Sequence, residues 1–469
     1  MLSKKYAGRL GEFLGVNEDG HLEIEGLDAV HLAETYGTPL FVYSERTIRS
    51  NYRCLYNTFK RFYSKFQIHF SVKANISPPL LRVLQTEGAG ADVGSFGELY
   101  VALLVGIDPS RIVCNGPNKS EEFIVEAVKS ESFLCVDNMD ELELIEKVSK
   151  RLNKPVKILV RVKPFSPKMT KDVYHHVRES KFGMPFEVAY EVFKRALKKE
   201  NVEPAGLHFH VGTQMLGADK AVAAAETMEF ASKLKENLGL DVEFLDVGGG
   251  LPVTRPYGYG MGYGTDAWEE TLKREFSLEK HIKDIVSAVR EKCEEHGLAE
   301  PTIIMEPGRY LLATAGTLLC RVCKIKEEPG AAKRIMVDAS VNVMPYVRYK
   351  FYFHPVIASK AAAPLEEKVW ICGNLCSWDF ENLYRDVEVP RVERGDILAF
   401  LDVGAYAETW ADQWMGFPRP AAILVNRGDA EIIRERETIQ DLIAKYRICL
   451  LYTSPSPRDR TRSRMPSSA

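Results

Sequence analysis

A lysine closes a short apolar run about seventy residues into the chain. Lys73 follows 68–72, a run typical of a buried strand, and lysine is rarely placed in such surroundings without a partner. The amine of a lysine in a desolvated pocket is nucleophilic and can form a Schiff base with a carbonyl group. The alternative is a lysine whose side chain merely reaches solvent at the strand end. Taken alone, Lys73 favours this plainer interpretation.

Two further segments could supply what a Schiff-base cofactor needs. Three glycines, Gly248 to Gly250, follow the strand-like run 243–247 and form either a tight turn or a nest of backbone N–H groups for a phosphate. The segment Glu306-Pro-Gly-Arg309 provides an acid, a glycine that permits close approach, and a cation. Pyridoxal 5′-phosphate requires an amine, a phosphate cradle and a carboxylate for its ring nitrogen. The combination therefore predicts a site for this cofactor.

The elements that must bring these segments together alternate between strand and helix. Strand-like runs occur at 68–73, 90–93, 111–115, 133–136, 157–162, 205–210, 243–247 and 302–306. Among the helical stretches, 121–128 places four apolar residues on one face, and 219–238 begins with Asp219 as its N-cap and stops at Gly239. Eight strands alternating with helices predict a (β/α)8 barrel, whose enzymes carry their chemistry at the carboxyl ends of the strands. The residues at those ends are Lys73, Asp92, Asn115, His210, Gly248–Gly250 and Glu306–Arg309.

After Arg309 the alternation of strand-like and helical stretches stops. Strand-like runs at 335–338, 368–372, 397–401, 422–425 and 431–433 are separated by loops with few helical patterns. We therefore expect an α/β fold, a (β/α)8 barrel followed by a mostly antiparallel β domain. The expected parts are an N-terminal segment 1–40 that pairs with the β domain, a barrel 41–309, a β domain 310–448 and a tail 449–469. The short pieces 22–24 and 41–43 are expected to pair with the β domain, and the Ser-, Pro- and Arg-rich tail is expected to be disordered.

Composition limits the classes of partner. A net charge of −3 over 469 residues gives no electrostatic reason to expect nucleic acid or an anionic membrane. Nine cysteines occur without paired CxxC motifs, which suits a reducing compartment. The sequence shows neither a secretory signal nor a run of about 18 apolar residues that could span a bilayer. We expect a soluble cytoplasmic protein that binds no nucleic acid, membrane or metal.

Eight short motifs, in one order, resemble those of a known family. They are Phe70–Asn75, Gly90–Glu98, Ser180–Gly183, His208–Gln214, Asp246–Gly250, Glu306–Arg309, Cys372–Cys376 and Gly404–Tyr406. From about residue 38 to about residue 445 the chain resembles the decarboxylases of diaminopimelate, ornithine and arginine. These combine an alanine-racemase-type barrel with a β domain and use pyridoxal 5′-phosphate. The resemblance implies an enzyme that decarboxylates an amino acid, a small-molecule substrate.

The resemblance also assigns a role to each matched residue at the cofactor. Lys73 would form the Schiff base, His210 would stack on the ring face, and Glu306 would pair with the ring nitrogen. Asp92 and Glu98 would support the ring and the lysine. Further contacts to the cofactor or the substrate would come from Thr213, Gly248, Gly249, Gly250, Gly308, Arg309 and Tyr406. The second histidine of the motif, His208, lies one layer deeper and is expected to be structural.

A homodimer with shared active sites is a further implication of the resemblance. Cys376 matches the cysteine that returns a proton to the substrate carbon after CO2 has left, and it would reach across from the second subunit. A thiol suits this task because its pKa can lie near neutrality. The alternative is an ordinary core cysteine.

The residues expected at the far end of the substrate depart from the diaminopimelate pattern. Enzymes of that specificity carry an acid directly after the cysteine, where this chain has Ser377. They also carry an arginine and, four residues later, a tyrosine, where this chain has Tyr346 and Lys350. Losing these groups removes partners for a distal ammonium and a distal carboxylate. We therefore predict a substrate other than meso-diaminopimelate, with one terminal negative group attracted by Lys350 and Arg348, such as an acylated or carrier-linked amino acid. An ordinary diaminopimelate decarboxylase remains the alternative.

Three other functions fit parts of the pattern. A racemase on the same barrel would need a tyrosine base opposite Lys73 and has no use for the Cys376 motif. A non-catalytic regulator related to decarboxylases would not need Lys73, the glycine triplet, Glu306 and Cys376 intact. A metal-dependent hydrolase built on His208-Phe-His210 is expected to lack acidic or histidine partners at matching strand ends.

Overall fold

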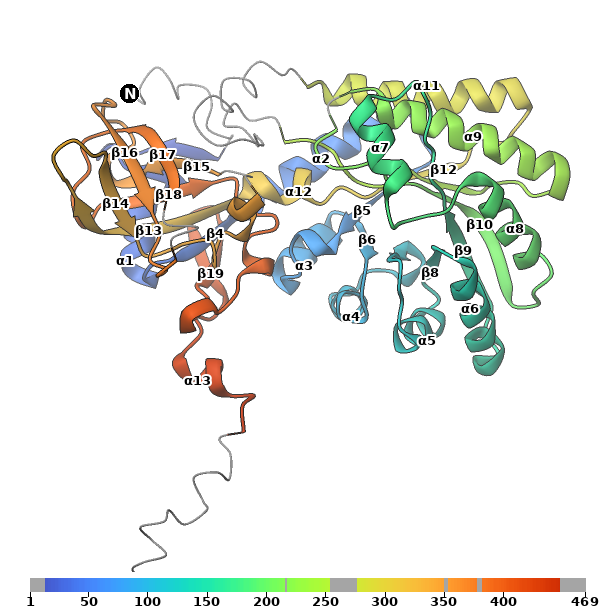
Figure 1. The fold of residues 1–469 in the computed structure, drawn as a ribbon, viewed down its shortest axis with the longest axis horizontal. Helices are drawn as coiled ribbons and strands as arrows, with labels where there is room; N and C mark the ends of the chain where they lie inside the picture. The colour runs from blue at the N-terminus through green and yellow to red at the C-terminus, as the bar shows by residue number, and fades with distance from the viewer. Residues whose placement is uncertain (1–12, 216, 254–275, 350–352, 378–381, 448–469) are drawn as a thin grey trace, which may run out of the picture.

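The structure is a computed structural model that describes residues 13–215, 217–253, 276–349, 353–377 and 382–447 (Figure 1). The loop 257–264, Lys350 and the tail 449–469 lie outside the described residues. The expectations for these three segments are therefore not addressed by the fold.

Eight parallel strands close into a barrel, as the sequence predicted (Figure 1). They are β5 (Phe66–Ser71), β6 (Gly90–Val93), β7 (Ile112–Cys114), β8 (Phe133–Val136), β9 (Val156–Arg161), β10 (Val202–His208), β11 (Phe244–Asp246) and β12 (Thr302–Met305). Each strand pairs with the next, and β12 pairs with β5 to complete the ring. The ends of the strands differ from the predicted ends by at most three residues.

Helices form the outer layer of the barrel (Figure 1). They are α2 (Glu45–Phe62), α3 (Pro78–Thr86), α4 (Phe96–Leu104), α5 (Glu121–Ser130), α6 (Met139–Leu152), α7 (Lys171–Glu179), α8 (Phe186–Ala196), α9 (Asp219–Leu238), α11 (Leu278–His296) and α12 (Arg309–Leu312). The four apolar residues expected on one face of α5 are buried, namely Phe123, Ile124, Ala127 and Val128.

The start of α9 differs from the prediction. Asp219 is the first helical residue, and Ala218 occupies the cap position without a side-chain hydrogen bond. The Asp219 carboxylate instead accepts hydrogen bonds from the backbone N–H of Thr170 at 2.6 Å and from its hydroxyl at 3.2 Å. A tertiary contact has therefore replaced local capping. At the other end Gly239 has φ 66°, the left-handed conformation predicted for it.

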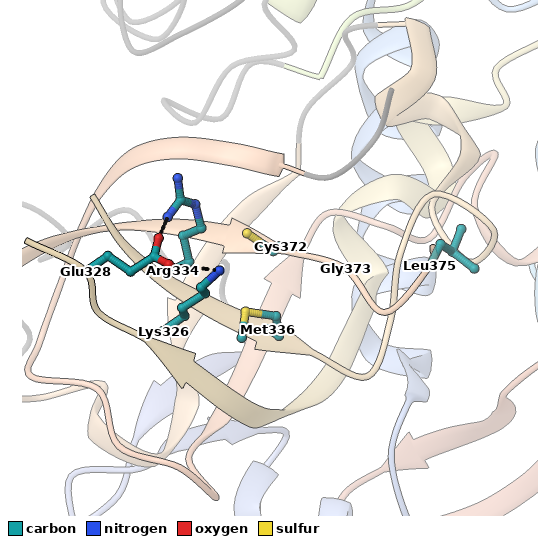
Figure 2. Close-up of a pocket in the computed structure, with 7 residues that line it drawn as sticks. All are labelled: Lys326, Glu328, Arg334, Met336, Cys372, Gly373 and Leu375. Carbon is teal, nitrogen blue, oxygen red and sulfur yellow. Dashed lines mark hydrogen bonds and ion pairs between the residues drawn. The ribbon is translucent and has the colours of Figure 1, made fainter. Parts of the chain in front are cut away.

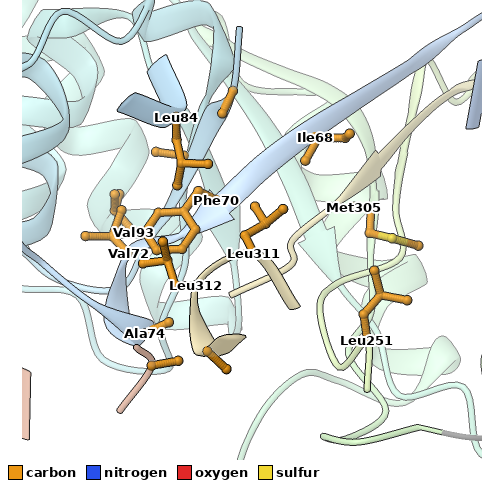
Figure 3. Packing of buried hydrophobic residues seen from close by; sticks show 14 of the residues in the cluster. Ile68, Phe70, Val72, Ala74, Leu84, Val93, Leu251, Met305, Leu311 and Leu312 are labelled. Atoms are coloured by element: carbon orange, nitrogen blue, oxygen red, sulfur yellow. The ribbon is translucent and has the colours of Figure 1, made fainter. Parts of the chain in front are cut away.

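Alternation along the strands separates an outer core from an inner one. In β5, Ile68 and Phe70 pack against Leu311 and other residues that cover the barrel from outside (Figure 3). A smaller cluster of side chains from five barrel strands forms the inner core: Val113, Phe133, Cys135, Leu159, Ala205 and Ile304. The barrel is thus filled by apolar side chains, and polar inward side chains gather at the carboxyl ends of its strands.

A nine-stranded sheet forms the β domain, at the left of Figure 1. Its strands are β4 (Leu40–Ser44), β13 (Gly316–Lys326), β14 (Lys333–Val337), β15 (His354–Ile357), β16 (Glu367–Cys372), β17 (Asn382–Val389), β18 (Ile397–Leu401), β19 (Ala421–Asn426) and β20 (Asp429–Arg434). The pairs β14–β16 and β4–β19 are parallel and the others antiparallel. All five predicted strands are present, and β13, β15 and β17 were missed.

The N-terminal strands divide between two sheets. The predicted piece 41–43 lies in β4 and pairs with β13 and β19. The piece 22–24 is β2 (Leu22–Ile24), which pairs with β1 (Leu14–Val16) and β3 (Leu27–Asp28) rather than with the β domain. It joins that domain only through side-chain packing. Two further helices are α1 (Ala29–Tyr36) and α13 (Ile439–Ile443). In the described part of the chain, no helix is long and apolar enough to cross a bilayer.

We expect Gly206→Ala to destabilise the barrel. A β-carbon at Gly206 would lie 2.2 Å from the carbonyl oxygen of Phe244 and 2.9 Å from a methyl group of Leu159. Because β10 and β11 would have to separate, the free energy of unfolding should fall by about 2 kcal/mol. The control is Gly15→Ala, whose β-carbon would meet nothing closer than Glu23 at 3.9 Å and should change stability by less than about 0.5 kcal/mol. Urea unfolding midpoints measure both; equal midpoints would contradict the close approach.

Candidate active site

Lys73 lies in a single 3-10 turn, Val72–Ala74, directly after β5. Its Nζ is 3.7 Å from Oδ2 of Asp92, and its side chain is 56% exposed whereas that of Asp92 is 4% exposed. The amine thus projects from a buried carboxylate into the open mouth of the barrel. Desolvation by the barrel wall opposes the charge, but Asp92, Tyr406 and Glu306 outweigh it and raise the pKa of Lys73 above its ordinary value. Lys73 is therefore an ammonium with a proton acceptor beside it.

The side-chain amide of Asn115 joins two buried carboxylates. Its Nδ2 donates to Oδ1 of Asp92 at 2.7 Å and to Oε1 of Glu306 at 2.7 Å. The hydroxyl of Ser71 donates to the other oxygen of Asp92 at 2.6 Å. These residues come from the carboxyl ends of β5, β6, β7 and β12, which the closed barrel brings together. The predicted meeting of strand ends is confirmed for Lys73, Asp92, Asn115 and Glu306.

The second oxygen of Glu306 faces His208, whose Nε2 lies 3.4 Å away. Burial lowers the pKa of His208, so the ring is neutral and its Nε2–H donates to the carboxylate. Burial raises the pKa of Glu306, but His208, Lys73 and Asp246 lower it by more, and the net shift is downward. Glu306 is therefore a buried carboxylate at neutral pH. His208 is buried in the barrel and contacts this carboxylate.

Asp246, at the end of β11, has the opposite protonation state. Burial and the neighbouring Glu306 raise the pKa of Asp246 well above its ordinary value. Its Oδ1 accepts the Gly248 N–H at 2.8 Å, whereas its buried Oδ2 has no donor among the described residues. A proton on Oδ2 that is donated to Glu306 accounts for both observations. The two acids thus share one proton and one charge.

His210 and the glycine triplet are joined by one hydrogen bond. The backbone N–H of Gly249 donates to Nδ1 of His210 at 3.1 Å, so the ring proton resides on Nε2. Burial, followed by repulsion from Lys73 and Arg161, lowers the pKa of His210 well below its ordinary value. The imidazole is therefore a flat, neutral ring held at the end of β10.

The glycine turn fits an anionic group. Gly248 and Gly250 have φ +64° and +91°, and a β-carbon on Gly249 would lie 2.3 Å from the carbonyl oxygen of Glu306. Side chains are thus excluded here. The N–H groups of the first two glycines bond to Asp246 and His210, whereas that of Gly250 has no acceptor among the described residues. Such an N–H at a bare turn suits a phosphate. Together with Lys73 and Glu306, the turn fits pyridoxal phosphate.

The β domain contributes an aromatic group to the mouth of the barrel. The guanidinium of Arg309 lies 4.7 Å from the ring centre of Tyr406 and 5.0 Å from that of Tyr346, whose hydroxyl it contacts at 3.3 Å. The Tyr346 ring also lies 5.1 Å from Tyr406 and 4.9 Å from Trp410. Tyr406 adopts φ +59° and donates its N–H to the carbonyl of Ala74 at 2.8 Å. The predicted residues Arg309, Tyr346 and Tyr406 are therefore together, next to the turn of Lys73.

Three other predicted residues occupy supporting or outer positions. Gly308 packs against the lysine turn, because a β-carbon there would lie 2.9 Å from that of Ala74. Glu98 accepts the N–H of Gly94 at 2.7 Å and so braces the loop after β6, with its pKa raised by burial. Thr213 is exposed in the turn after β10.

Cys376 and Ser377 are not brought to Lys73 by contacts within the described chain. Both follow β16, Cys376 is exposed, and no hydrogen bond joins either residue to the described barrel. Earlier residues of the same loop line a separate cavity of about 210 Å³ (Figure 2), whose lining consists of Lys326, Glu328, Arg334, Met336, Cys372, Gly373 and Leu375. Glu328 pairs with both cations of this cavity, at 3.1 and 3.2 Å, so we assign it no ligand.

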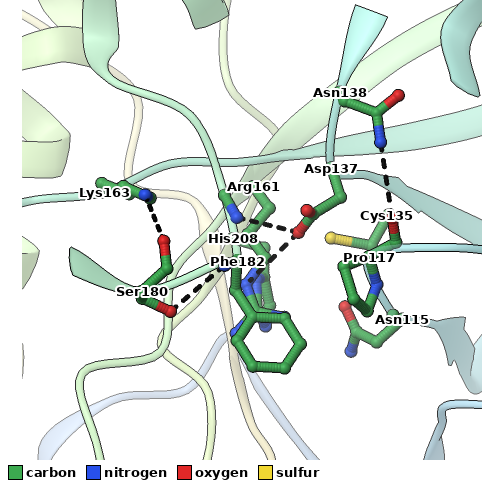
Figure 4. Close-up of polar contacts among 12 residues, drawn as sticks. Asn115, Pro117, Cys135, Asp137, Asn138, Arg161, Lys163, Ser180, Phe182 and His208 are labelled. Atoms are coloured by element: carbon green, nitrogen blue, oxygen red, sulfur yellow. Dashed lines mark hydrogen bonds and ion pairs between the residues drawn. The ribbon is translucent and has the colours of Figure 1, made fainter. Parts of the chain in front are cut away.

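Sequence reasoning overlooked a supporting group on β8 and β9 (Figure 4). The guanidinium of Arg161 lies 4.5 Å from the ring centre of Phe182, and its Nε is 3.9 Å from Oδ1 of Asp137. Asp137 also accepts the N–H of Gly183 at 2.9 Å. These contacts fasten the Ser180–Gly183 motif to the barrel. The available signal was an arginine at the end of an otherwise apolar strand.

One expectation about metal ligands was wrong. His208 does have acidic partners, because β11 and β12 place Asp246 and Glu306 so that potential ligand atoms of all three lie within 4.8 Å of one another. His210 is not part of this group. Within this group His208 Nε2 lies 3.4 Å from Glu306, and Glu306 and Asp246 shift each other's pKa in opposite directions.

Known proteins resemble the chain over most of its length. Residues 47–313 match the family described as pyridoxal-dependent decarboxylase, pyridoxal binding domain. The chain is 36% identical over 436 residues to diaminopimelate decarboxylase of Methanothermobacter thermautotrophicus, covering 91% of this chain and 96% of that protein. It is 32% identical over 434 residues to that of Bacillus subtilis, with 91% and 95% covered. A crystal structure of diaminopimelate decarboxylase from M. jannaschii superposes with a TM-score of 0.84 at 33% identity, covering 93% and 98% of the two chains.

We expect Asp246→Asn to gain stability relative to the wild type as pH rises. Between about pH 4 and the pKa of folded Asp246, the folded residue keeps its proton while the unfolded residue loses it. In this range the free energy of unfolding of the wild type falls by up to about 1.4 kcal/mol per pH unit. Asparagine keeps a donor for Glu306 and an acceptor for Gly248 without titrating. Chemical unfolding of the cofactor-free proteins at several pH values measures the difference.

Asp246→Ala is the control for this experiment. It removes the donor to Glu306 and should lose about 1–3 kcal/mol of stability. A difference between the wild type and Asp246→Asn that is constant with pH would contradict a protonated Asp246.

Proposed function

The chain belongs to the family of pyridoxal-dependent decarboxylases, and from this premise we propose which residues act and which substrate they accept. The protein is an enzyme that uses pyridoxal 5′-phosphate to remove CO2 from an amino acid. Its relatives favour neither a racemase nor a non-catalytic regulator. When bound, pyridoxal phosphate supplies an electron sink for the substrate carbon. The protein must hold the cofactor, orient the substrate and move protons.

Lys73 and Glu306 are the two anchors that we propose for the cofactor ring. Lys73 would form the covalent link, with Asp92 taking the proton that its ammonium must lose. Glu306 would pair with the ring nitrogen, and His210 would lie against the ring face. The observation that carries this proposal is the geometry at the buried Glu306 side chain, where Asn115 donates to one oxygen at 2.7 Å and Nε2 of His208 lies 3.4 Å from the other. A charged acid at this place would keep the ring nitrogen protonated.

The phosphate would lie at the glycine turn. The bare N–H of Gly250 and the close packing of Gly248 and Gly249 support this placement. Gly308 and Thr213 belong to neighbouring strand-end turns and would complete the cradle. Arg309 would contribute its charge to the phosphate or to the carboxylate of the substrate.

We propose that Cys376 acts from the second subunit of a homodimer. Its thiol would give a proton to the substrate carbon after CO2 has left. Two observations support a shared site: Cys376 is exposed and makes no hydrogen bond to the described barrel, and Trp410, Trp414 and Met415 expose large apolar surfaces on the β domain.

We also propose that the protein resides in the cytoplasm. The eight cysteines in the described part of the chain are all free, which suits a reducing compartment.

The substrate that we propose is an amino acid whose far end differs from that of diaminopimelate. Tyr346 replaces an arginine and is engaged by Arg309, Tyr406 and Trp410, so it forms an aromatic wall. Ser377 offers no carboxylate to a distal ammonium. An extended acyl group fits this lining better than a charged amine does.

Of the two cations expected to attract a negative group at the far end of the substrate, Arg348 already has an ion-pair partner. The charge of Arg348 is balanced by Asp412, whose carboxylate lies 3.1 Å away. Attraction of a negative group of the substrate would therefore have to come from Lys350. The proposed substrate is therefore an amino acid with an acylated or carrier-linked side chain. Decarboxylation of meso-diaminopimelate is the second candidate, and the names of the relatives favour it.

A mixing experiment tests the shared site. Lys73→Ala should abolish both activity and the visible absorbance of the bound cofactor, whereas Cys376→Ala should keep the absorbance and lose most turnover. Each mixed dimer would contain one intact site, so random exchange of subunits should restore about a quarter of wild-type activity. Absence of rescue after verified exchange would argue against shared sites. A Lys73→Ala protein that still turned over substrate would contradict the assignment of Lys73.

A panel of substrates tests the proposed specificity. CO2 release would be measured from meso-diaminopimelate, ornithine, lysine, arginine, glutamate and their side-chain acylated forms. We expect kcat/KM at least about tenfold higher for an acylated amino acid than for meso-diaminopimelate, a difference of about 1.4 kcal/mol. The double variant Tyr346→Arg, Ser377→Glu should reduce this preference. Efficient, stereospecific conversion of meso-diaminopimelate to lysine by the wild type would establish the second candidate instead.

A further inference from the structure

A lysine is buried directly beneath the glycine triplet. Lys220 is the second residue of α9, and its side chain is fully buried. Its Nζ donates to the carbonyl oxygens of Val247 at 3.0 Å and Gly248 at 3.3 Å, and also to that of Gly249. No carboxylate lies within 4.0 Å of this ammonium in the described part of the chain. The three carbonyls satisfy its hydrogen bonds but carry no full negative charge.

The position of Lys220 is costly for the folded protein. Burying an ammonium without an ion-pair partner destabilises the folded protein, even after the surroundings relax. The start of a helix adds to this cost, because the helix dipole is positive at that end. Burial lowers the pKa of Lys220 to about 8, although Glu306 and Asp246 act in the opposite direction. An apolar side chain would fill the same space without this penalty, so packing alone does not explain the lysine.

The hydrogen bonds of Lys220 also orient the turn above it. In a trans peptide the C=O and N–H bonds point in opposite directions. Because Lys220 holds the carbonyl of Gly249, the N–H of Gly250 in the same peptide unit points away from Lys220. This is the N–H group without an acceptor among the described residues. A charge-assisted hydrogen bond to the carbonyl polarises the peptide and strengthens its N–H as a donor.

We propose that Lys220 is a positioning residue for the phosphate group of the cofactor. It acts through the peptide between Gly249 and Gly250, which it fixes with the N–H outward, and it provides a buried positive charge that a phosphate dianion neutralises. The inference rests on the proposed function, because it takes the glycine turn as the phosphate site. Arg309 contributes differently, since its guanidinium lies among aromatic rings at the mouth rather than beneath the turn.

Comparison of two ligands tests this proposal. Cofactor-free protein is titrated with pyridoxal phosphate and with pyridoxal, which lacks the phosphate, and the dissociation constants are read from visible absorbance. Lys220→Met should weaken binding of pyridoxal phosphate about 30-fold, as expected for lost hydrogen bonds to a charged group, and that of pyridoxal less than about threefold. Lys220→Gln, which keeps donors and loses the charge, should fall between Lys220→Met and the wild type.

Lys119 provides a matched control. It is also buried and also donates to backbone carbonyls, but its Nζ forms an ion pair with Glu141 at 3.0 Å. None of these partners belongs to the glycine turn. Lys119→Met should leave the ratio of the two dissociation constants unchanged even if it lowers stability. If Lys220→Met does not fold, Lys220→Gln carries the same comparison.

The outcomes separate this inference from the proposed function. An equal loss for both ligands, or no loss for either, in the Lys220 variants would overturn the inference. If the wild type binds pyridoxal phosphate and this binding does not depend on Lys73, the role of Lys73 in the proposed function is contradicted, whatever the Lys220 variants show. If binding depends on Lys73 and the Lys220 variants show no phosphate-specific loss, only the role of Lys220 is contradicted.

Discussion

At the mouth of the barrel one amide group holds two buried carboxylates in place. Asn115 donates to both Asp92 and Glu306, and hydrogen bonds to charged groups contribute about 1.5–3 kcal/mol each. Without this bridge the two acids would repel each other in a poorly solvated site. Lys73 is located by the first acid, and His208 and Asp246 are arranged around the second. One short side chain directly after β7 thus links the acid beside the amine to the acid for a ring nitrogen.

The β domain is part of this arrangement. Its residue Tyr406 donates a backbone hydrogen bond to Ala74, in the turn of Lys73, and Asn75 bonds to the hydroxyl of Tyr43 on β4 and to the carbonyl of Gly404. The lysine turn is therefore held from both domains. A tyrosine at φ +59° is strained, and such strain persists only where neighbouring contacts over-determine the backbone. The two domains thus act as one unit at the active site.

The eight barrel strands could be predicted because buried parallel strands are short apolar runs with polar residues at their ends. The same rule brought Lys73, Asp92, Asn115 and Glu306 together. The rule could not predict the protonation of Asp246, because that depends on distances across the barrel. It also could not predict the aromatic group around Tyr346, because its members lie on loops far apart in the sequence. Strand β13 was missed because its end, Arg321–Lys326, lacks strict alternation of polar and apolar residues and because the strand closely follows the short helix α12. Nor could the rule place Cys376, which lies in an exposed loop after β16.

The central place of β4 has a consequence for synthesis of the chain. Leu40–Ser44 lies between β13 and β19, yet β13 begins at Gly316 and β19 at Ala421. The ribosome therefore releases an apolar strand long before either hydrogen-bonding partner exists, whereas each barrel strand from β6 to β12 is made after the strand before it, with which it pairs. Non-local pairing of this kind is slow, and unpaired strand edges favour aggregation. The barrel can assemble progressively, but the sheet that supplies Tyr406, and with it a finished active site, must wait for almost the whole chain.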